Sequence, residues 1–176
     1  MPAPVRIRTG LPLLAVTYAV YELDGVDTTR LSEGRRARMR GEDFGFVFQQ
    51  GLLMPELTAV ENVSLPLVLD GMPTRSADAR GKELLNRVGL GDKAKSRLET
   101  LSGGQQQKVQ LGVTVMNNPK ILILDEPTKG FDPVNRRLLL DIVDGHRRAG
   151  ATVVIITHQM EEVERLCDRI LLLKDG

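Results

Sequence analysis

Three short apolar runs, each followed by polar side chains, organise the sequence. The runs cover residues 44–48, 121–124 and 152–157, and they are followed by Gln49, by Asp125 with Glu126, and by His158. The second run, which ends in adjacent carboxylates, is typical of a strand that is buried on both faces of a parallel sheet. The second run therefore delivers Asp125 and Glu126 to a crevice at its C-terminal end, where open α/β sheets bind their ligands.

Helical patterns occupy the segment between the first two runs. Thr58 and Glu61 form a capping-box pattern ahead of an apolar segment, in which we expect Pro66 to bend or end the helix. Residues 76–88 then predict an amphipathic helix that is stopped by Gly89. Residues 51–104 are thus expected to be mostly helical.

The C-terminal half alternates strand and helix, which predicts a parallel α/β core. Pro133 opens a helix that ends near Gly150, and a helix over 160–166 and a last strand over 169–173 follow. We expect one domain over residues 1–176 with an atypical N-terminal stretch at 1–21, a helical subdomain at about 51–104 and an α/β core at 105–176.

A glycine-rich segment lies at the start of the helix that precedes the second strand. It reads Leu101-Ser102-Gly103-Gly104-Gln105, and it places a hydroxyl and two side-chain-free backbones at a helix N-terminus. Exposed N–H groups and the positive end of the helix dipole suit a phosphate there. This segment, followed by the strand that ends in Asp125-Glu126-Pro127 and by Gly130-Phe131-Asp132, resembles the signature and Walker B motifs of the ATP-binding-cassette (ABC) ATPases.

The resemblance covers roughly residues 22–176 and implies a P-loop NTPase-type α/β fold with an inserted helical subdomain. It also implies ATP and Mg²⁺ as cofactors. Asp125 resembles the magnesium ligand, Glu126 the general base that polarises the attacking water, and His158 the switch histidine that contacts the γ-phosphate. Gln49 resembles the glutamine that senses magnesium and water, and Asp132 the aspartate at the dimer seam.

The simpler alternatives stay open for single residues. A pair of carboxylates can be a solvated strand end, a lone histidine after a strand is often incidental, and Asp132 before Pro133 can cap a helix. The surrounding motifs favour the functional interpretation of each, and for Asp132 both interpretations can hold.

The resemblance implies partners as well. Ser102, Gly103, Gly104 and Gln105 would contact ATP bound to a second subunit, in a homo- or heterodimer with head-to-tail arrangement. No run is long enough to span a bilayer, so a separate membrane permease is expected, with this chain peripheral to the cytoplasmic face of the membrane. Because the net charge is +1 and aromatic residues make up only 3% of the chain, we expect no nucleic-acid partner.

One family motif is missing from the sequence. The phosphate-binding loop, Gly-x-x-x-x-Gly-Lys-Ser/Thr, should precede Gln49, but no glycine in that part of the chain is followed by Lys-Ser or Lys-Thr. Residues 1–20 match nothing recognisable, and we interpret them as a truncated or replaced start. We therefore expect weak nucleotide affinity and turnover near background for this chain by itself.

Three functional hypotheses follow. The first is an ATPase subunit of an ABC transporter, and the second is a catalytically impaired partner or truncated product whose signature completes the ATP site of an intact subunit. The third, a DNA-repair or chromosome ATPase, is disfavoured because coiled-coil heptads and zinc cysteines are absent. Residues 22–75 resemble exporters of lipoproteins or macrolides, and residues 120–176 resemble sodium exporters, so no transport substrate is assigned.

Overall fold

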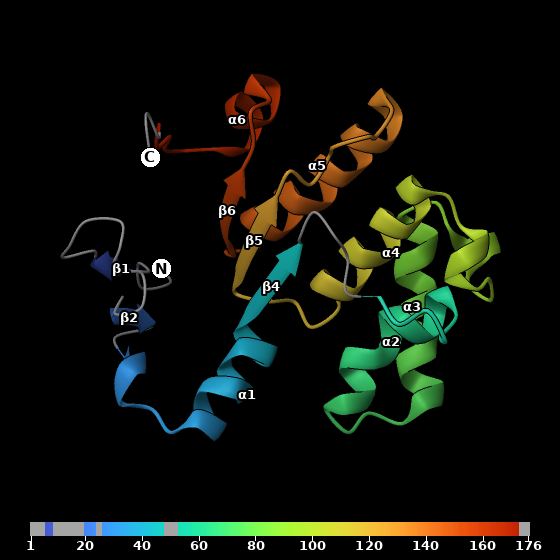
Figure 1. Ribbon diagram of the computed structural model, residues 1–176, viewed down its shortest axis with the longest axis horizontal. Coiled ribbons are helices and arrows are strands. Elements are labelled where there is room, and N and C mark those ends of the chain that lie inside the picture. Colours follow the sequence, from blue (N-terminus) through green and yellow to red (C-terminus); the bar gives the residue numbers. More distant parts are fainter. Residues whose placement is uncertain (1–5, 9–19, 24–25, 48–52, 173–176) are drawn as a thin grey trace.

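A parallel sheet forms the centre of the protein. The computed structural model describes residues 6–8, 20–23, 26–47 and 53–172. Strands β4 (Phe44–Val47), β5 (Ile121–Asp125) and β6 (Thr152–Ile156) lie side by side in the order β4-β5-β6, and their arrows point the same way in Figure 1. The pairing is parallel, with Val47 opposite Leu124 and Asp125 opposite Ile156. The predicted α/β fold class is therefore confirmed.

Burial explains why these strands lie where they do. In β5, Ile121, Leu122 and Leu124 are buried, as expected for a strand between two neighbours. Gly45 in β4 allows a close approach, because a Cβ atom there would lie 2.8 Å from the carbonyl oxygen of Thr114. The helix that carries Thr114 therefore packs directly against the backbone of β4.

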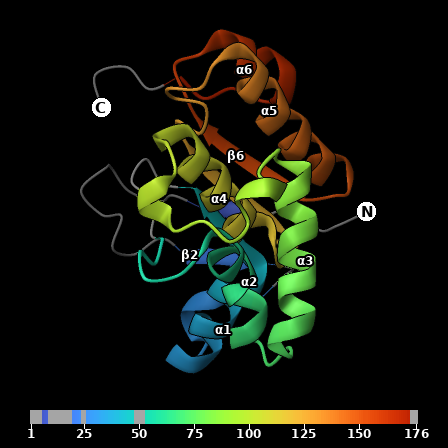
Figure 2. The same cartoon turned by 90° about the vertical axis from the view of Figure 1, so that its right-hand side faces the viewer.

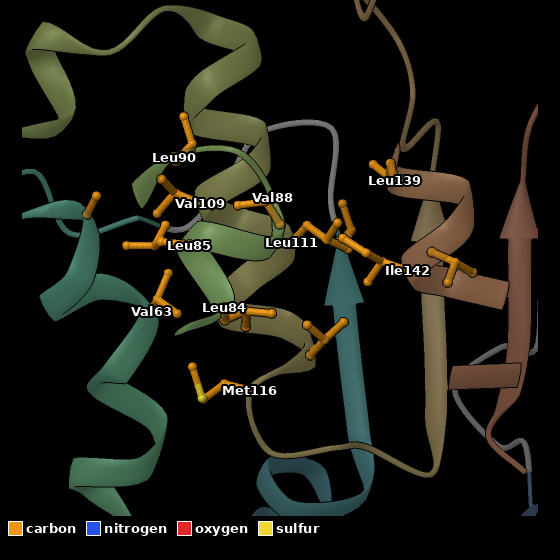
Figure 3. Packing of buried hydrophobic residues seen from close by; sticks show 14 of the residues in the cluster. Val63, Leu84, Leu85, Val88, Leu90, Val109, Leu111, Met116, Leu139 and Ile142 are labelled. Carbon is orange, nitrogen blue, oxygen red and sulfur yellow. The ribbon is translucent and has the colours of Figure 1, made fainter. Parts of the chain in front are cut away.

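A group of helices packs beside β4. It consists of α2 (Ala59–Leu69), α3 (Thr74–Arg87) and α4 (Gly103–Val115), with the short 3₁₀ helices η3 (Gly91–Lys93) and η4 (Leu98–Thr100) between α3 and α4. Figure 2 shows α2 and α3 on the side facing the viewer. Val63, Leu85 and Val109 are fully buried where these helices meet (Figure 3). This apolar contact fixes the position of α4, which begins at the glycine-rich segment.

The remaining helices precede or follow the strands of the sheet along the chain. Helix α5 (Pro133–Arg148) follows β5, with its apolar side buried through Leu139, Leu140, Ile142 and Val143, and α6 (Met160–Leu166) follows β6. Helix α1 (Glu33–Asp43) leads directly into β4. Strands β1 (Arg6–Arg8), β2 (Val20–Leu23) and β3 (Val26–Asp27) form a separate antiparallel sheet, and the 3₁₀ helix η2 (Thr28–Arg30) connects it to α1.

The predictions for α2 were partly correct. The capping box is present, with the Thr58 hydroxyl accepting from the Glu61 N–H and the Glu61 carboxylate accepting from the Thr58 N–H. The helix does not end at Pro66 but continues to Leu69. A proline in this position removes a single N–H donor, and the burial of Val63 and Leu67 on either side of it stabilises the helix.

The predicted strand at 169–173 is wrong for the residues that the structure describes. Residues 169–172 are irregular, and the side chains of Ile170, Leu171 and Leu172 are exposed. Strands need a partner, and within the described residues β6 pairs only with β5. Among the described helices, none has the length and apolar character needed to cross a lipid bilayer.

Candidate functional site

The end of β5 holds the two adjacent carboxylates. Glu126 follows the strand directly, and its N–H donates to the carbonyl oxygen of Ile156 at 2.9 Å, which extends the pairing with β6. Its φ angle is +47°, in the left-handed region that residues with a side chain rarely adopt. Such strain is retained where the surrounding structure enforces it, often at functional sites.

The Glu126 side chain turns toward His158. The Nδ1 atom of His158 lies 2.8 Å from Oε1 of Glu126, and the two side chains are 73% and 20% exposed. A neutral imidazole with its proton on Nδ1 donates a hydrogen bond in this geometry, and an imidazolium forms an ion pair. A half-buried carboxylate with an imidazole against it can accept a proton and remain oriented, which is what a general base requires.

Asp125 takes a separate position from Glu126. It is the last residue of β5 and is half-buried. In the described part of the chain, neither a hydrogen bond nor an ion pair engages its carboxylate. No group of three or more His, Cys, Asp or Glu side chains that could hold a metal ion lies among the described residues. A metal ion held by Asp125 would therefore need further ligands that do not belong to a group of three such side chains in the described residues.

The predicted glutamine cannot be placed. Gln49 lies outside the described residues, and the last described residue before it is Val47, at the C-terminal end of β4. Because β4 is parallel to β5, Val47 and Asp125 lie at the same edge of the sheet.

The glycine-rich segment forms the N-terminus of α4. Ser102 is the N-cap, and it forms a capping box with Gln105: the Gln105 side chain accepts from the Ser102 N–H at 2.9 Å. Gly103 is open to solvent, since a Cβ atom there would meet nothing within 4 Å. The described residues around the adjoining cavity of about 610 Å³ include Gly103 and Gly104 but neither Glu126 nor His158.

The turn between β5 and α5 packs against α4. The Gln107 side chain donates to the carbonyl oxygen of Lys129 at 3.1 Å, and a Cβ atom at Gly104 would lie 3.7 Å from the ring of Phe131. Asp132 caps α5 by accepting from the N–H groups of Val134 at 2.9 Å and Asn135 at 3.0 Å. These bonds, the one from Asn135 above all, lower the pKa of Asp132. The cap predicted from Pro133 is confirmed.

A buried pair was missed by sequence reasoning. The Thr128 hydroxyl donates to Oε1 of Glu162, and the two residues are 1% and 0% exposed. The available signal was the position of Glu162 on the apolar face of α6, next to Val163 and one turn before Leu166. Nearby, burial first and then the carboxylates of Asp168 and Glu162 raise the pKa of the Cys167 thiol.

Comparisons with known proteins agree with the motifs. A family model described as "ABC transporter" matches residues 17–129. The methionine import ATP-binding protein MetN 3 of Pectobacterium atrosepticum is 40% identical over 155 residues, which cover 88% of this chain and 45% of that protein. The lipoprotein-releasing system ATP-binding protein LolD 2 of Caulobacter vibrioides is 41% identical over 155 residues, which cover 88% of this chain and 68% of that protein.

A solved structure matches as well. The dimeric ATP-binding cassette MJ0796, in a post-hydrolysis state bound to ADP and Pi, superposes with a TM-score of 0.78 at 32% identity. The match covers 85% of this chain and 66% of that one. The chain thus spans less than half the length of the methionine import relatives and about two thirds of the solved cassette.

Proposed function

Because the chain belongs to the ABC transporter family of ATP-binding proteins, we propose that it is an ATP-binding subunit that couples ATP binding and hydrolysis to substrate movement through a separate membrane permease. The observation that carries this proposal is the contact between Glu126 and His158 at the C-terminal edge of the parallel sheet. The relatives include a methionine import protein and a lipoprotein-releasing protein, so they suggest neither one substrate nor one direction of transport.

In this proposal Glu126 is the general base. Its carboxylate accepts a proton from the attacking water, and the His158 imidazole holds the carboxylate and contacts the γ-phosphate. The Glu126 carboxylate contacts His158, whereas the Asp125 carboxylate has no partner among the described residues, so we assign the two carboxylates different roles. Gln49 is proposed to orient the water and the metal ion from the end of β4.

The donor set at the end of β5 fits Mg²⁺. Magnesium favours oxygen ligands and is usually bound by one or two carboxylates together with phosphate and water. Asp125 supplies one half-buried carboxylate, and within the described residues that group has no protein partner to displace. When bound, the ion would neutralise negative charge on the phosphates. Asp125 and Gln49 are its proposed ligands.

The second ATP-binding subunit is proposed to face the N-terminus of α4. Ser102, Gly103, Gly104 and Gln105 then contribute to the ATP site of that subunit, and Asp132 lies at the seam between the two. Two features support this arrangement: the open surface at Gly103, and a neighbouring cavity whose described lining includes Gly103 and Gly104 but neither Glu126 nor His158. The solved cassette that resembles this chain is dimeric. Contact with the permease would place the chain at the inner face of the membrane.

We further propose a domain division along the lines expected from the sequence. The helices within residues 51–104 form a subdomain that carries the signature, and residues 105–176 form the α/β core with both carboxylates and His158. The burial of Val63 in α2 and Leu85 in α3 supports a helical unit, and α4, which crosses the proposed boundary, packs against it through Val109.

The second candidate function is a catalytically impaired partner. The observation that favours it is the missing Gly-x-x-x-x-Gly-Lys-Ser/Thr stretch in these 176 residues. The lysine and the backbone N–H groups of that loop supply charge-assisted contacts to phosphate, each worth roughly 1.5–3 kcal/mol. In this alternative the chain binds ATP weakly and completes the site of an intact subunit through residues 102–105.

Calorimetry of ATP binding with Mg²⁺ separates the two candidates. We compare this chain with a version in which a Gly-x-x-x-x-Gly-Lys-Ser loop is restored before Glu22. Binding by the restored version alone would support the second candidate, because the remainder would then be a sound cassette that binds ATP poorly without the loop. Equal binding by both would assign a phosphate site to residues 1–20 and contradict our interpretation of the missing loop.

A further inference from the structure

Two side-chain contacts join the same two segments of the chain. The first links the Glu126 carboxylate to Nδ1 of His158 at 2.8 Å. In the second contact the Thr128 hydroxyl donates to Glu162. Thr128 follows Glu126 by two positions in the turn after β5, and Glu162 follows His158 by four positions and lies in α6. The first contact is at the surface, with His158 73% exposed, whereas Thr128 and Glu162 are almost completely buried.

Glu162 occupies an unusual environment for a carboxyl group. It is 0% exposed and shares the buried face of α6 with Val163 and Leu166. Its second oxygen, Oε2, is buried and has no hydrogen-bond partner among the described residues. Burying a polar atom without a partner costs free energy, so an apolar residue would stabilise this face better. An apolar residue at position 162 could not accept the hydrogen bond from Thr128, which is what the carboxyl group provides.

The turn that contains Thr128 begins at Glu126, the residue with the strained backbone. Glu126 has φ of +47°, and its N–H is fixed on one side by Ile156 of β6. On the other side, the Lys129 N–H donates to the Glu126 carbonyl at 3.1 Å. These backbone bonds close the turn, but they do not attach it to α6. In the described residues the Thr128 side chain provides that attachment through Glu162.

We propose that Thr128 and Glu162 are positioning residues: their buried hydrogen bond fixes the turn after β5 to α6 and thereby keeps the Glu126 carboxylate in contact with His158. The catalytic meaning of this bond rests on the proposed function, whereas the contact that it maintains does not. The hydroxyl is the essential group on Thr128, so serine can replace it and valine, which has the same shape, cannot.

The test observes His158 directly. The chain contains two histidines, so the ring nitrogens of His158 and His146 can be assigned in a ¹⁵N-labelled sample of the full chain. The Glu126→Gln variant defines the ring shifts of His158 when the carboxylate is lost. His146, on α5, serves as the internal control for the fold. No ATP is added, so a failure of the proposed hydrolysis does not affect the result.

We expect Thr128→Val to move the His158 ring shifts at least halfway to those of Glu126→Gln, while Thr128→Ser retains the parent shifts. A merely stabilising role would lower the melting temperature of Thr128→Val and leave His158 unchanged, and that result overturns the proposal. Loss of the parent shifts in folded Thr128→Ser overturns it as well.

A second variant approaches the contact from α6. Glu162→Asp withdraws the acceptor by one methylene and keeps the carboxylate, so it remains informative if Thr128→Val does not fold. We expect it to move the His158 shifts in the same direction as Thr128→Val. Parent shifts in folded Glu162→Asp would show that the bond does not hold the turn, and they would also overturn the proposal.

Discussion

His158 and Glu126 are separated by 32 positions in the sequence, yet Nδ1 of one lies 2.8 Å from Oε1 of the other. The contact arises because β5 and β6 are adjacent and parallel, with Asp125 opposite Ile156. Each side chain follows the C-terminal end of its strand, so both emerge at the same edge of the sheet.

The first prediction concerns catalysis by this pair. In the chain with a restored phosphate loop, Glu126→Gln should lower ATP turnover by about 10²- to 10⁴-fold, because a positioned general base contributes that much. His158→Ala should also lower turnover, since it removes the group that orients the carboxylate. The measurement is phosphate release under saturating ATP, with binding followed separately by calorimetry.

Binding provides the control for this prediction. Glu126→Gln should bind ATP as well as its parent, because the change affects proton transfer rather than phosphate contacts. Undiminished turnover in Glu126→Gln would remove Glu126 from the role of base. In the chain without the restored loop, we expect turnover near background in the parent and in both variants.

The second prediction concerns Gly45 in β4. A Cβ atom there would lie 2.8 Å from the Thr114 carbonyl oxygen and 2.9 Å from side-chain atoms of Pro119 and Leu122. Gly45→Ala should therefore lower the free energy of unfolding by about 1–3 kcal/mol, the usual cost of overpacking a core. Urea unfolding measures the change.

Gly41 in α1 is the matched control for Gly45. An added Cβ atom would meet nothing within 4 Å, and glycine inside a helix is less favourable than alanine by roughly 0.5–1 kcal/mol. Gly41→Ala should thus be neutral or stabilising. The same sign for both variants would mean that the space around Gly45 can relax and that its close packing is not required.

Local signals explain which parts of the fold were predictable. The capping box of Thr58 and Glu61 and the cap of Asp132 depend on residues within one helical turn, and both were correct. The strand at 121–125 was predictable because a central parallel strand is apolar on both faces. The strand expected at 169–173 depends on a neighbour, which no apolar pattern can guarantee.

The candidate site was harder to predict, because its contacts join segments that are far apart in the sequence. The motifs indicated Glu126 and His158 as separate candidates, but their direct contact follows from the order of the strands. Thr128 and Glu162 escaped attention because threonine and glutamate are ordinary surface residues, and only their near-complete burial distinguishes them. Gln49 lies outside the described residues, so its role stays a prediction.

The third prediction concerns the pH dependence of α2. Hydrogen bonds from Thr58, first from its hydroxyl and then from its N–H, lower the pKa of Glu61 below its ordinary value of 4.5. The folded state therefore favours the carboxylate, and its stabilisation is fully present above the unfolded pKa and is lost as pH falls through the folded pKa. The stability advantage of the parent over Glu61→Gln should be constant near neutral pH and shrink below about pH 4.5.

Thr58→Ala tests the cause of this pH dependence. It removes the hydroxyl that donates to Glu61 at 2.6 Å, so the advantage over its own Glu61→Gln derivative should be smaller and depend less on pH. Thermal unfolding between pH 3 and pH 7 measures all four chains. An unchanged pH profile in Thr58→Ala would assign the effect to the causes that remain in this variant, which are the N–H of residue 58 and the charge of Arg97.

The fourth prediction separates two roles of Asp132. As the N-cap of α5 it accepts from the N–H groups of Val134 and Asn135, and asparagine caps helices about as well as aspartate. Asp132→Ala should lower the melting temperature, whereas Asp132→Asn should preserve it near neutral pH. As a dimer-seam residue, however, Asp132 would act through its charge, which both variants remove.

The dimer is measured by sedimentation with ATP, in the restored-loop chain that also carries Glu126→Gln to prevent turnover. We expect Asp132→Asn to fold as stably as its parent but to dimerise more weakly. Equal dimerisation would restrict Asp132 to capping, because its bonds to α5 alone would then account for the residue. Weaker dimerisation at unchanged stability would instead require a charged group of the second subunit near the start of α5, which is the arrangement that the proposed seam demands.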